Sequence, residues 1–182
     1  GYEADDIIGT MTRESAGWRI GKEGCEVIII TGDSDALQLV RSNVKVYTMK
    51  KGVNDIAEYG EDEVRERYGL EPEQLIDWKG LKGDASDNIK GVKGIGEKTA
   101  TDLLKKFGSI DKIYAALEKG GADISKTVAT KLAEGKKDAL FSRELARIDQ
   151  HVPLYEGRGS SPEGRDSSRA GEPITVRLEN VI

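Results

Sequence analysis

Acidic residues occur in three short sets along this 182-residue chain. The sets are Glu3, Asp5 and Asp6, then Asp33 and Asp35, then Asp84 and Asp87. Helix capping and turn formation explain each set taken alone. Three such coincidences are less convincing than one common cause, because carboxylates gathered in one pocket repel each other unless cations fill it. Carboxylate oxygens suit Mg²⁺ and Mn²⁺, so we predict that these seven residues are catalytic ligands of divalent metals.

The middle set follows the run Glu26-Val27-Ile28-Ile29-Ile30, which is short, apolar and β-branched. This pattern predicts a buried parallel strand that ends in a turn at Thr31-Gly32-Asp33. Open α/β sheets bind ligands at the carboxyl ends of such strands. Two Mg²⁺ or Mn²⁺ ions about 4 Å apart can clamp the attacking and the leaving oxygen of a phosphodiester. The predicted chemistry is therefore two-metal phosphodiester hydrolysis.

A glycine-rich segment, Gly91-Val92-Lys93-Gly94-Ile95-Gly96-Glu97-Lys98-Thr99, follows the third acidic set. It superficially resembles a P-loop, but Glu97 stands where that motif has lysine, and helix-like sequence precedes it instead of a strand. We predict a helix–hairpin–helix turn, in which glycines let backbone amides approach a DNA phosphate closely. An ordinary interhelical turn is the alternative. The predicted DNA-binding residues are Gly91, Val92, Lys93, Gly94, Ile95, Gly96, Lys98 and Thr99.

The remaining pattern predicts the elements that position these residues. The first part, residues 1–80, is expected to be an α/β core with helices over 3–16, 33–40, 61–68 and 72–80, a loop over 17–24, and a second strand over 44–48 before a turn at 50–52. The second part, residues 81–154, is expected to be helical, with helices over 97–107, 109–117, 125–132 and 137–148. Residues 155–182 are rich in Gly, Ser, Arg and Pro, so we expect a disordered or divergent tail.

Composition limits the partners of the chain. Its net charge of −5 argues against a uniformly basic nucleic-acid binder, although local patches decide binding. The single cysteine, Cys25, excludes an internal disulfide framework. No stretch approaches the roughly 18 apolar residues of a membrane span, and the sequence shows no signal peptide. We expect a monomeric cytoplasmic protein without a membrane partner.

Four ordered motifs resemble the 5′-nuclease family, which includes the 5′→3′ exonuclease domains of bacterial DNA polymerase I and the flap endonucleases. The motifs are Gly1-Tyr2-Glu3-Ala4-Asp5-Asp6, Thr31-Gly32-Asp33-Ser34-Asp35, Gly83-Asp84-Ala85-Ser86-Asp87-Asn88, and the glycine-rich segment up to Ala100. The resemblance extends from Gly1 to about Leu154. It implies a PIN-like (Rossmann-like) α/β core followed by a helical subdomain with a helix–hairpin–helix motif.

The same resemblance implies a function. It implies two divalent ions at the seven acids, a K⁺ ion at the hairpin, and hydrolysis of 5′ ends, 5′ flaps, and nicked or branched DNA in bacterial replication and repair, including Okazaki fragment processing. It also implies a location near the nucleoid.

Two features depart from the family pattern. The family's earliest acids and its helical arch lie on elements that precede the first motif, so we expect an amino-terminally truncated chain. The family usually has proline where Lys90 and Lys93 stand, so we expect a looser and more basic hairpin. A non-catalytic module that binds duplex DNA therefore stays open as the alternative to a nuclease.

Overall fold

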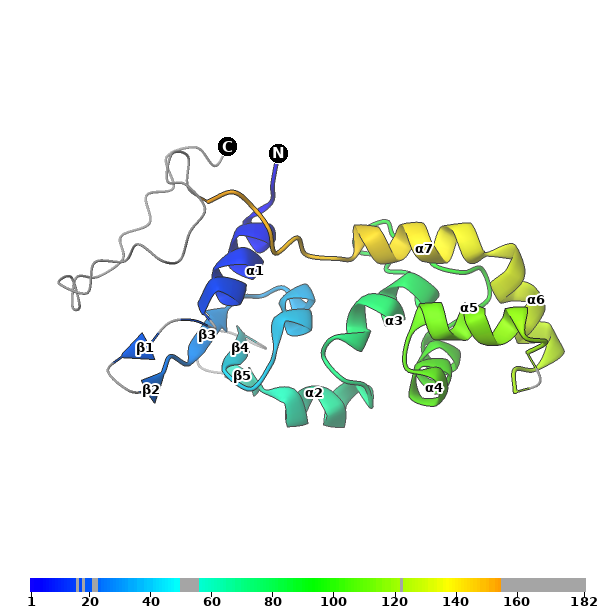
Figure 1. The fold of residues 1–182 in the computed structure, drawn as a ribbon, viewed down its shortest axis with the longest axis horizontal. Helices are drawn as coiled ribbons and strands as arrows, with labels where there is room; N and C mark the ends of the chain where they lie inside the picture. Colours follow the sequence, from blue (N-terminus) through cyan, green and yellow to red (C-terminus); the bar gives the residue numbers. More distant parts are fainter. Residues whose placement is uncertain (16, 18, 21–22, 50–55, 122, 155–182) are drawn as a thin grey trace.

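The computed structural model describes residues 1–154 except 16, 18, 21–22, 50–55 and 122 (Figure 1). The elements are α1 (Ala4–Ser15), β1 (Arg19–Ile20), β2 (Glu23–Gly24), β3 (Val27–Ile30), the 3₁₀ helix η1 (Ser34–Leu39), β4 (Val44–Met49), β5 (Ile56–Tyr59), α2 (Glu61–Tyr68), α3 (Gln74–Lys82), α4 (Glu97–Phe107), α5 (Ile110–Glu118), α6 (Lys126–Glu134) and α7 (Lys136–Leu145). The larger sheet has the order β3-β4-β5, and an all-helical part follows. The predicted α/β core with a helical second part is confirmed.

Strand β3 forms where its apolar run predicts it and pairs in parallel with β4. The prediction that this strand is buried was wrong for half of its residues. Ile29 is 5% exposed, whereas Ile28 and Ile30 are 46% and 72% exposed. Successive side chains of a strand point to opposite faces, so Ile28 and Ile30 share one face and Ile29 lies on the other. One face of β3 therefore stays open to solvent.

Five further elements differ from the sequence predictions. Strand β5, which was not predicted, pairs antiparallel with β4. The expected loop over 17–24 contains β1 and β2, which pair through two residues each. The helix after Asp33 is a 3₁₀ helix, and the last helix ends at Leu145 instead of residue 148. The turn predicted at 50–52 and the tail 155–182 lie outside the described residues.

Two hydrophobic clusters hold the fold, and α3 contributes to both. The first cluster joins the sheet and η1 and includes Leu75 of α3. The second cluster fills the helical part around Trp78 and Leu81 of the same helix. The chain also returns to the sheet after α7, where Gln38 donates a hydrogen bond to the carbonyl of Ala146 (3.0 Å). The division into domains at residue 80 stays a prediction.

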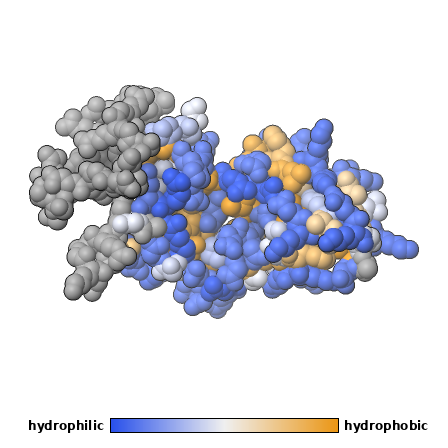
Figure 2. All heavy atoms as spheres, viewed as in Figure 1, coloured by the Kyte–Doolittle hydropathy of each residue, from blue (hydrophilic) through white to orange (hydrophobic). Residues whose placement is uncertain are grey.

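The surface is mostly hydrophilic on the face shown in Figure 2, with an apolar area over one end of α7. Phe141 and Leu145 of α7 are 65% and 55% exposed. Within the described ranges, no helix is both long enough and apolar enough for a membrane span.

Candidate metal centre

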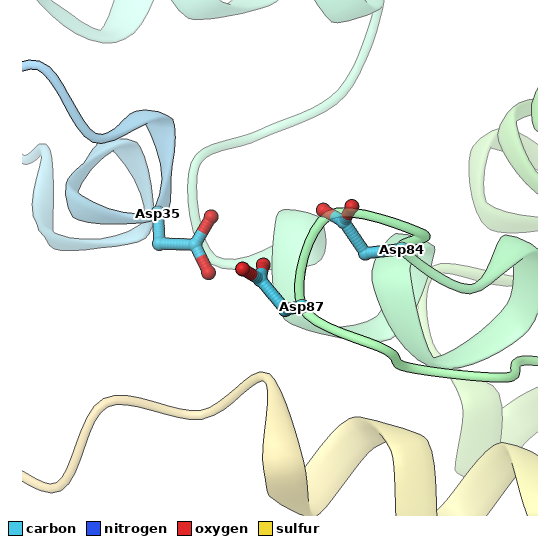
Figure 3. A group of neighbouring side chains, drawn as sticks. All are labelled: Asp35, Asp84 and Asp87. Atoms are coloured by element: carbon cyan, nitrogen blue, oxygen red, sulfur yellow. The ribbon is translucent and has the colours of Figure 1, made fainter.

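Three of the seven predicted acids meet in space. Asp35 comes from η1, whereas Asp84 and Asp87 come from the loop after α3, and Figure 3 shows the Asp35 carboxylate facing that loop. One carboxylate oxygen from each residue lies within 4.8 Å of the other two. We call Asp35, Asp84 and Asp87 the acidic triad. Its all-oxygen donor set is the kind that Mg²⁺ and Mn²⁺ prefer.

Asp33 fixes the position of Asp35 through a helix cap. The Asp33 side chain accepts a hydrogen bond from the backbone N–H of Asp35 (2.8 Å), which begins η1 directly after the end of β3. This is the capping role that Asp33 was also predicted to have. The strand end and its cap therefore aim Asp35 toward the loop after α3.

The loop that carries Asp84 and Asp87 is closed at its base. Asp84 and Ile89 exchange two backbone hydrogen bonds of 2.8 and 2.7 Å. Gly83 and Gly91 pack backbone against backbone at positive φ angles of 78° and 62°, and a Cβ at Gly91 would lie 2.2 Å from the Gly83 nitrogen. Both positions therefore require glycine. This close approach fixes the orientation of the loop.

Lys79 of α3 lies among the three carboxylates. Its Nζ is 2.7 Å from an oxygen of Asp84 and 3.4 Å from one of Asp87, and it also pairs with Asp35. The Lys79 side chain is only 11% exposed. We did not predict this residue. The available signal was that Lys79 follows Leu75 by four residues and so continues the apolar face of α3.

The pKa values show how strongly Lys79 compensates the triad. Burial raises the pKa of Asp35, and the charges of Asp33 and Asp87 raise it further against the opposing effect of Lys79. Burial also acts upward on Asp84, but hydrogen bonds from Lys79 and Ser86 outweigh it and hold the pKa of Asp84 at about 2. Burial alone would lower the pKa of Lys79, but Asp35 and Asp84 raise it above its usual value. Lys79 thus compensates part of the negative charge that the three carboxylates bring together.

The first acidic set lies beside the triad without joining it. Asp6 accepts hydrogen bonds from the backbone N–H groups of Glu3 (3.0 Å) and Asp149 (2.8 Å), so both of its oxygens stabilise backbone. Burial raises the pKa of Asp5, and the charges of Asp33, Glu3 and Asp6 add to this shift. The charge of Asp33 therefore acts on both Asp5 and Asp35. Among the described residues, the triad is the single group of three acids that comes within metal-binding distance.

The predicted hairpin divides into buried and exposed residues. Val92 and Ile95 belong to the helical core, and the Gly91 N–H donates to the Ser142 hydroxyl (3.0 Å), so these groups face inward. The exposed residues are Lys93, Gly94, Gly96, Glu97 and Lys98, of which Glu97 was not a predicted DNA contact. Gly94 has a φ of 81°, and its carbonyl accepts a hydrogen bond from Lys131 (3.0 Å). The predicted DNA contact is thus restricted to the exposed residues, the partly buried Thr99, and backbone.

The acid stability of the chain without metal is expected to depend on Asp84. Its pKa falls from an ordinary 3.8 to about 2 on folding, so its stabilising effect is present above pH 4 and is lost as the pH falls from about 4 to about 2. The raised pKa of Asp35 acts in the opposite direction, because protonation of Asp35 as the pH falls toward 4 favours the folded state. Chemical unfolding in EDTA between pH 7 and pH 2 measures how Asp84 and Asp35 each change the free energy of unfolding. We expect Asp84→Asn to remove the loss of stability that Asp84 causes below pH 4. An unchanged dependence of the unfolding free energy on pH would contradict the ion pair with Lys79.

The fold and the site define a class of protein. Residues 1–69 match the family described as 5′-3′ exonuclease, N-terminal resolvase-like domain, and residues 70–159 match 5′-3′ exonuclease, C-terminal SAM fold. The chain belongs to the 5′-3′ exonuclease family.

Its curated relatives include bacterial DNA polymerase I. The chain is 45% identical over 153 residues to DNA polymerase I of Bacillus subtilis (strain 168) and 46% identical over 154 residues to that of Bacillus caldotenax. Each match covers 84% of this chain and 16% of the relative. The chain therefore spans about one sixth of the length of these relatives.

Solved structures show the same fold. T5 5′-exonuclease with bound zinc matches with a TM-score of 0.66 at 24% identity, covering 82% of this chain and 51% of that one. T5 D15 flap endonuclease in a pseudo-enzyme-product complex with DNA and metal ions matches with a TM-score of 0.63, also at 24% identity, covering 82% of this chain and 50% of that one.

Proposed function

We propose that this chain is part of a structure-specific 5′→3′ exonuclease and 5′-flap endonuclease that uses two divalent metals on DNA. The observation that carries the proposal is the acidic triad, in which Asp35 follows the carboxyl end of β3, Asp84 and Asp87 come from the loop after α3, and the buried Lys79 pairs with all three carboxylates. Membership of the 5′-3′ exonuclease family supports it. Replication and repair in the bacterial cytoplasm, near the nucleoid, are the proposed setting.

The acidic triad is proposed to form one metal site, and the first acidic set together with Asp33 is proposed to contribute to the other. Asp35, Asp84 and Asp87 would hold one Mg²⁺ or Mn²⁺ ion, and Glu3, Asp5, Asp6 and Asp33 would contribute to a second. When bound, such ions supply positive charge that stabilises the attacking and leaving oxygens of a phosphodiester. The chain's own residues orient the site: Asp33 caps η1 and holds Asp35, while the closed loop holds Asp84 and Asp87.

The hairpin is the proposed contact with duplex DNA. Lys93 and Lys98 are exposed there and would pair with phosphates, whereas the exposed backbone near Gly94 and Gly96 would approach them closely. A K⁺ ion at the hairpin carbonyls belongs to the same proposal. It would share or replace the contact that Lys131 makes with the Gly94 carbonyl. These contacts carry no base sequence information, as a structure-specific nuclease requires.

Cleavage of a labelled 5′-flap duplex by the 182-residue chain tests the proposal. We expect cleavage with Mg²⁺ and none with EDTA. A second candidate is a module that binds duplex DNA without cutting it, which is favoured by the position of Glu3, Asp5 and Asp6 outside the triad. Duplex binding with neither metal-dependent cleavage nor calorimetric Mg²⁺ binding would support this second candidate and overturn the first.

Gly96→Val is expected to weaken duplex binding by roughly tenfold, since a side chain at this position would keep a phosphate away from the backbone amides at the start of α4. Gly96 has an extended backbone, and no atom lies within 4 Å of a Cβ built there. The fold should therefore tolerate the change, whereas a side chain at Gly94 would be strained by its positive φ. Fluorescence anisotropy with a labelled duplex measures the effect. Wild-type affinity in the Gly96 variant would mean that the hairpin is only a turn.

A further inference from the structure

A pocket of about 290 Å³ opens beside the acidic triad. Its lining includes Asp35, Lys79 and Asp84 of the acidic site, together with Arg67 and Tyr68 of α2 and Trp78 and Lys82 of α3. Ligand pockets for small molecules start at about 300 Å³, so this space suits one nucleotide-sized group. Neither Arg67 nor Lys82 was singled out from the sequence.

Arg67 and Lys82 are cations held by aromatic rings instead of carboxylates. The Arg67 guanidinium lies 5.1 Å from the ring centre of Tyr68 and 5.3 Å from that of Tyr59, whose hydroxyl it also contacts. The Lys82 ammonium lies 4.2 Å from the ring centre of Trp78. Within the described part of the chain, neither makes an ion pair, whereas the neighbouring Lys79 makes three. Their charges are thus available to an anion.

The aromatic rings also fix where these charges point. Tyr68 and Trp78 pack edge to face with ring centres 5.4 Å apart, and the Trp78 N–H donates to the Thr101 hydroxyl (3.0 Å). Trp78 is 7% exposed, so it acts as a wall and not as a free stacking platform. The two rings and the hydrogen bond to the Tyr59 hydroxyl restrict the position of the Arg67 guanidinium, and the planar fork of its N–H groups matches the oxygens of a phosphate.

We propose that this pocket binds a single nucleotide unit through its phosphate, with Arg67 and Lys82 contacting the phosphate oxygens and the acidic triad at the adjoining wall. The inference rests on the proposed nuclease function, because that function brings nucleotides to the triad. Glu97, Asp35 and Asp84 also line the pocket and repel a phosphate, so a divalent ion at the triad should strengthen binding. The occupant is either a released mononucleotide or the terminal nucleotide of a strand.

Titration calorimetry of the 182-residue chain with deoxyadenosine 5′-monophosphate tests the proposal, since this compound has no phosphodiester to be cleaved. With Mg²⁺ present, we expect a dissociation constant of about 1 mM or tighter and no measurable binding of deoxyadenosine, which lacks the phosphate. Arg67→Met and Lys82→Met keep much of the side-chain length and remove the charge. Each should weaken binding by roughly tenfold, the effect of losing one charge-assisted hydrogen bond.

Lys119→Met is the matched control, because Lys119 is exposed at the end of α5 and does not line the pocket. It should bind the nucleotide as the unchanged chain does, and thermal unfolding should show that all variants fold. A 5′-phosphorylated dinucleotide with an uncleavable methylphosphonate link separates the two sources of the ligand. Tighter binding of this dinucleotide would assign the pocket to a strand terminus, and tighter binding of the mononucleotide would assign it to the product.

Equal affinity of the unchanged chain and the Arg67 and Lys82 variants, or no binding at all, would overturn the pocket assignment. The flap assay separates this failure from that of the proposed function. Metal-dependent cleavage without nucleotide binding would overturn the pocket alone. Nucleotide binding that depends on Arg67 and Lys82, in a chain that neither cuts DNA nor binds Mg²⁺, would support the pocket and overturn the nuclease.

Discussion

Asp35→Asn is expected to lower metal-dependent flap cleavage by about a thousandfold, which corresponds to roughly 4 kcal/mol of transition-state stabilisation. Asp35 supplies the carboxylate that faces Asp84 and Asp87 from the opposite side of the site (Figure 3). Asparagine keeps the shape of the side chain but removes the negative charge that attracts a divalent ion. Calorimetric titration should show that Asp35→Asn also binds Mg²⁺ more weakly. This measurement tests the metal site independently of the cleavage rate.

The stability of the Asp35 variant separates loss of function from loss of folding. Burial and the neighbouring acids disfavour the charged form of Asp35, as its raised pKa shows. We therefore expect Asp35→Asn to unfold in EDTA at the same temperature as the unchanged chain or at a higher one. Asp62→Asn is the control, since Asp62 is 92% exposed and pairs only with Arg65 among the described residues. Wild-type cleavage by Asp35→Asn would remove Asp35 from the metal site.

Local signals sufficed to predict many of the elements. Helices were predicted over 61–68, 97–107 and 109–117, and in the structure Gly69 ends α2 with a positive φ, Gly108 ends α4, and Ser109 caps α5. Asp35 was predicted as a metal ligand because it follows the end of an apolar strand. Asp84 and Asp87 were predicted as its partners, and they lie three residues apart in the sequence. Each of these features depends on a few consecutive residues, so a sequence pattern can reveal it.

The parts that were missed depend on contacts between distant segments. Lys79 pairs with Asp35, which is 44 residues earlier, and nothing local distinguishes it from a solvated lysine except its place on an apolar face. Asp6 accepts a hydrogen bond from the backbone of Asp149, 143 residues away. The exposure of Ile28 and Ile30 likewise shows that no described element packs over their face of the sheet, which the composition of β3 does not encode.

Lys79→Met should give the second large effect, this time on stability. The ion pairs of Lys79 tie α3 to η1 and to the loop of Asp84, and its carboxylate partners Asp35 and Asp84 are 18% and 17% exposed. Removing one partner of a buried ion pair costs roughly 3–5 kcal/mol, because the remaining charges stay buried and uncompensated. The pKa of Lys79 is raised on folding, so its contribution is fully present at pH 7 and is lost only as the pH rises above the ordinary lysine range. Chemical unfolding in EDTA measures the loss.

The same variant shows whether the ammonium stands where a metal binds. If it does, Mg²⁺ no longer has to displace a cation in Lys79→Met and should bind at least tenfold more tightly, which would restore much of the lost stability. Lys119→Met is the control, because Lys119 is exposed at the end of α5 and makes no ion pair among the described residues. It should change neither metal-free stability nor Mg²⁺ affinity. Lys79→Met could instead unfold like the unchanged chain in EDTA and bind Mg²⁺ no more tightly. Lys79 would then neither stabilise the fold nor occupy the metal position.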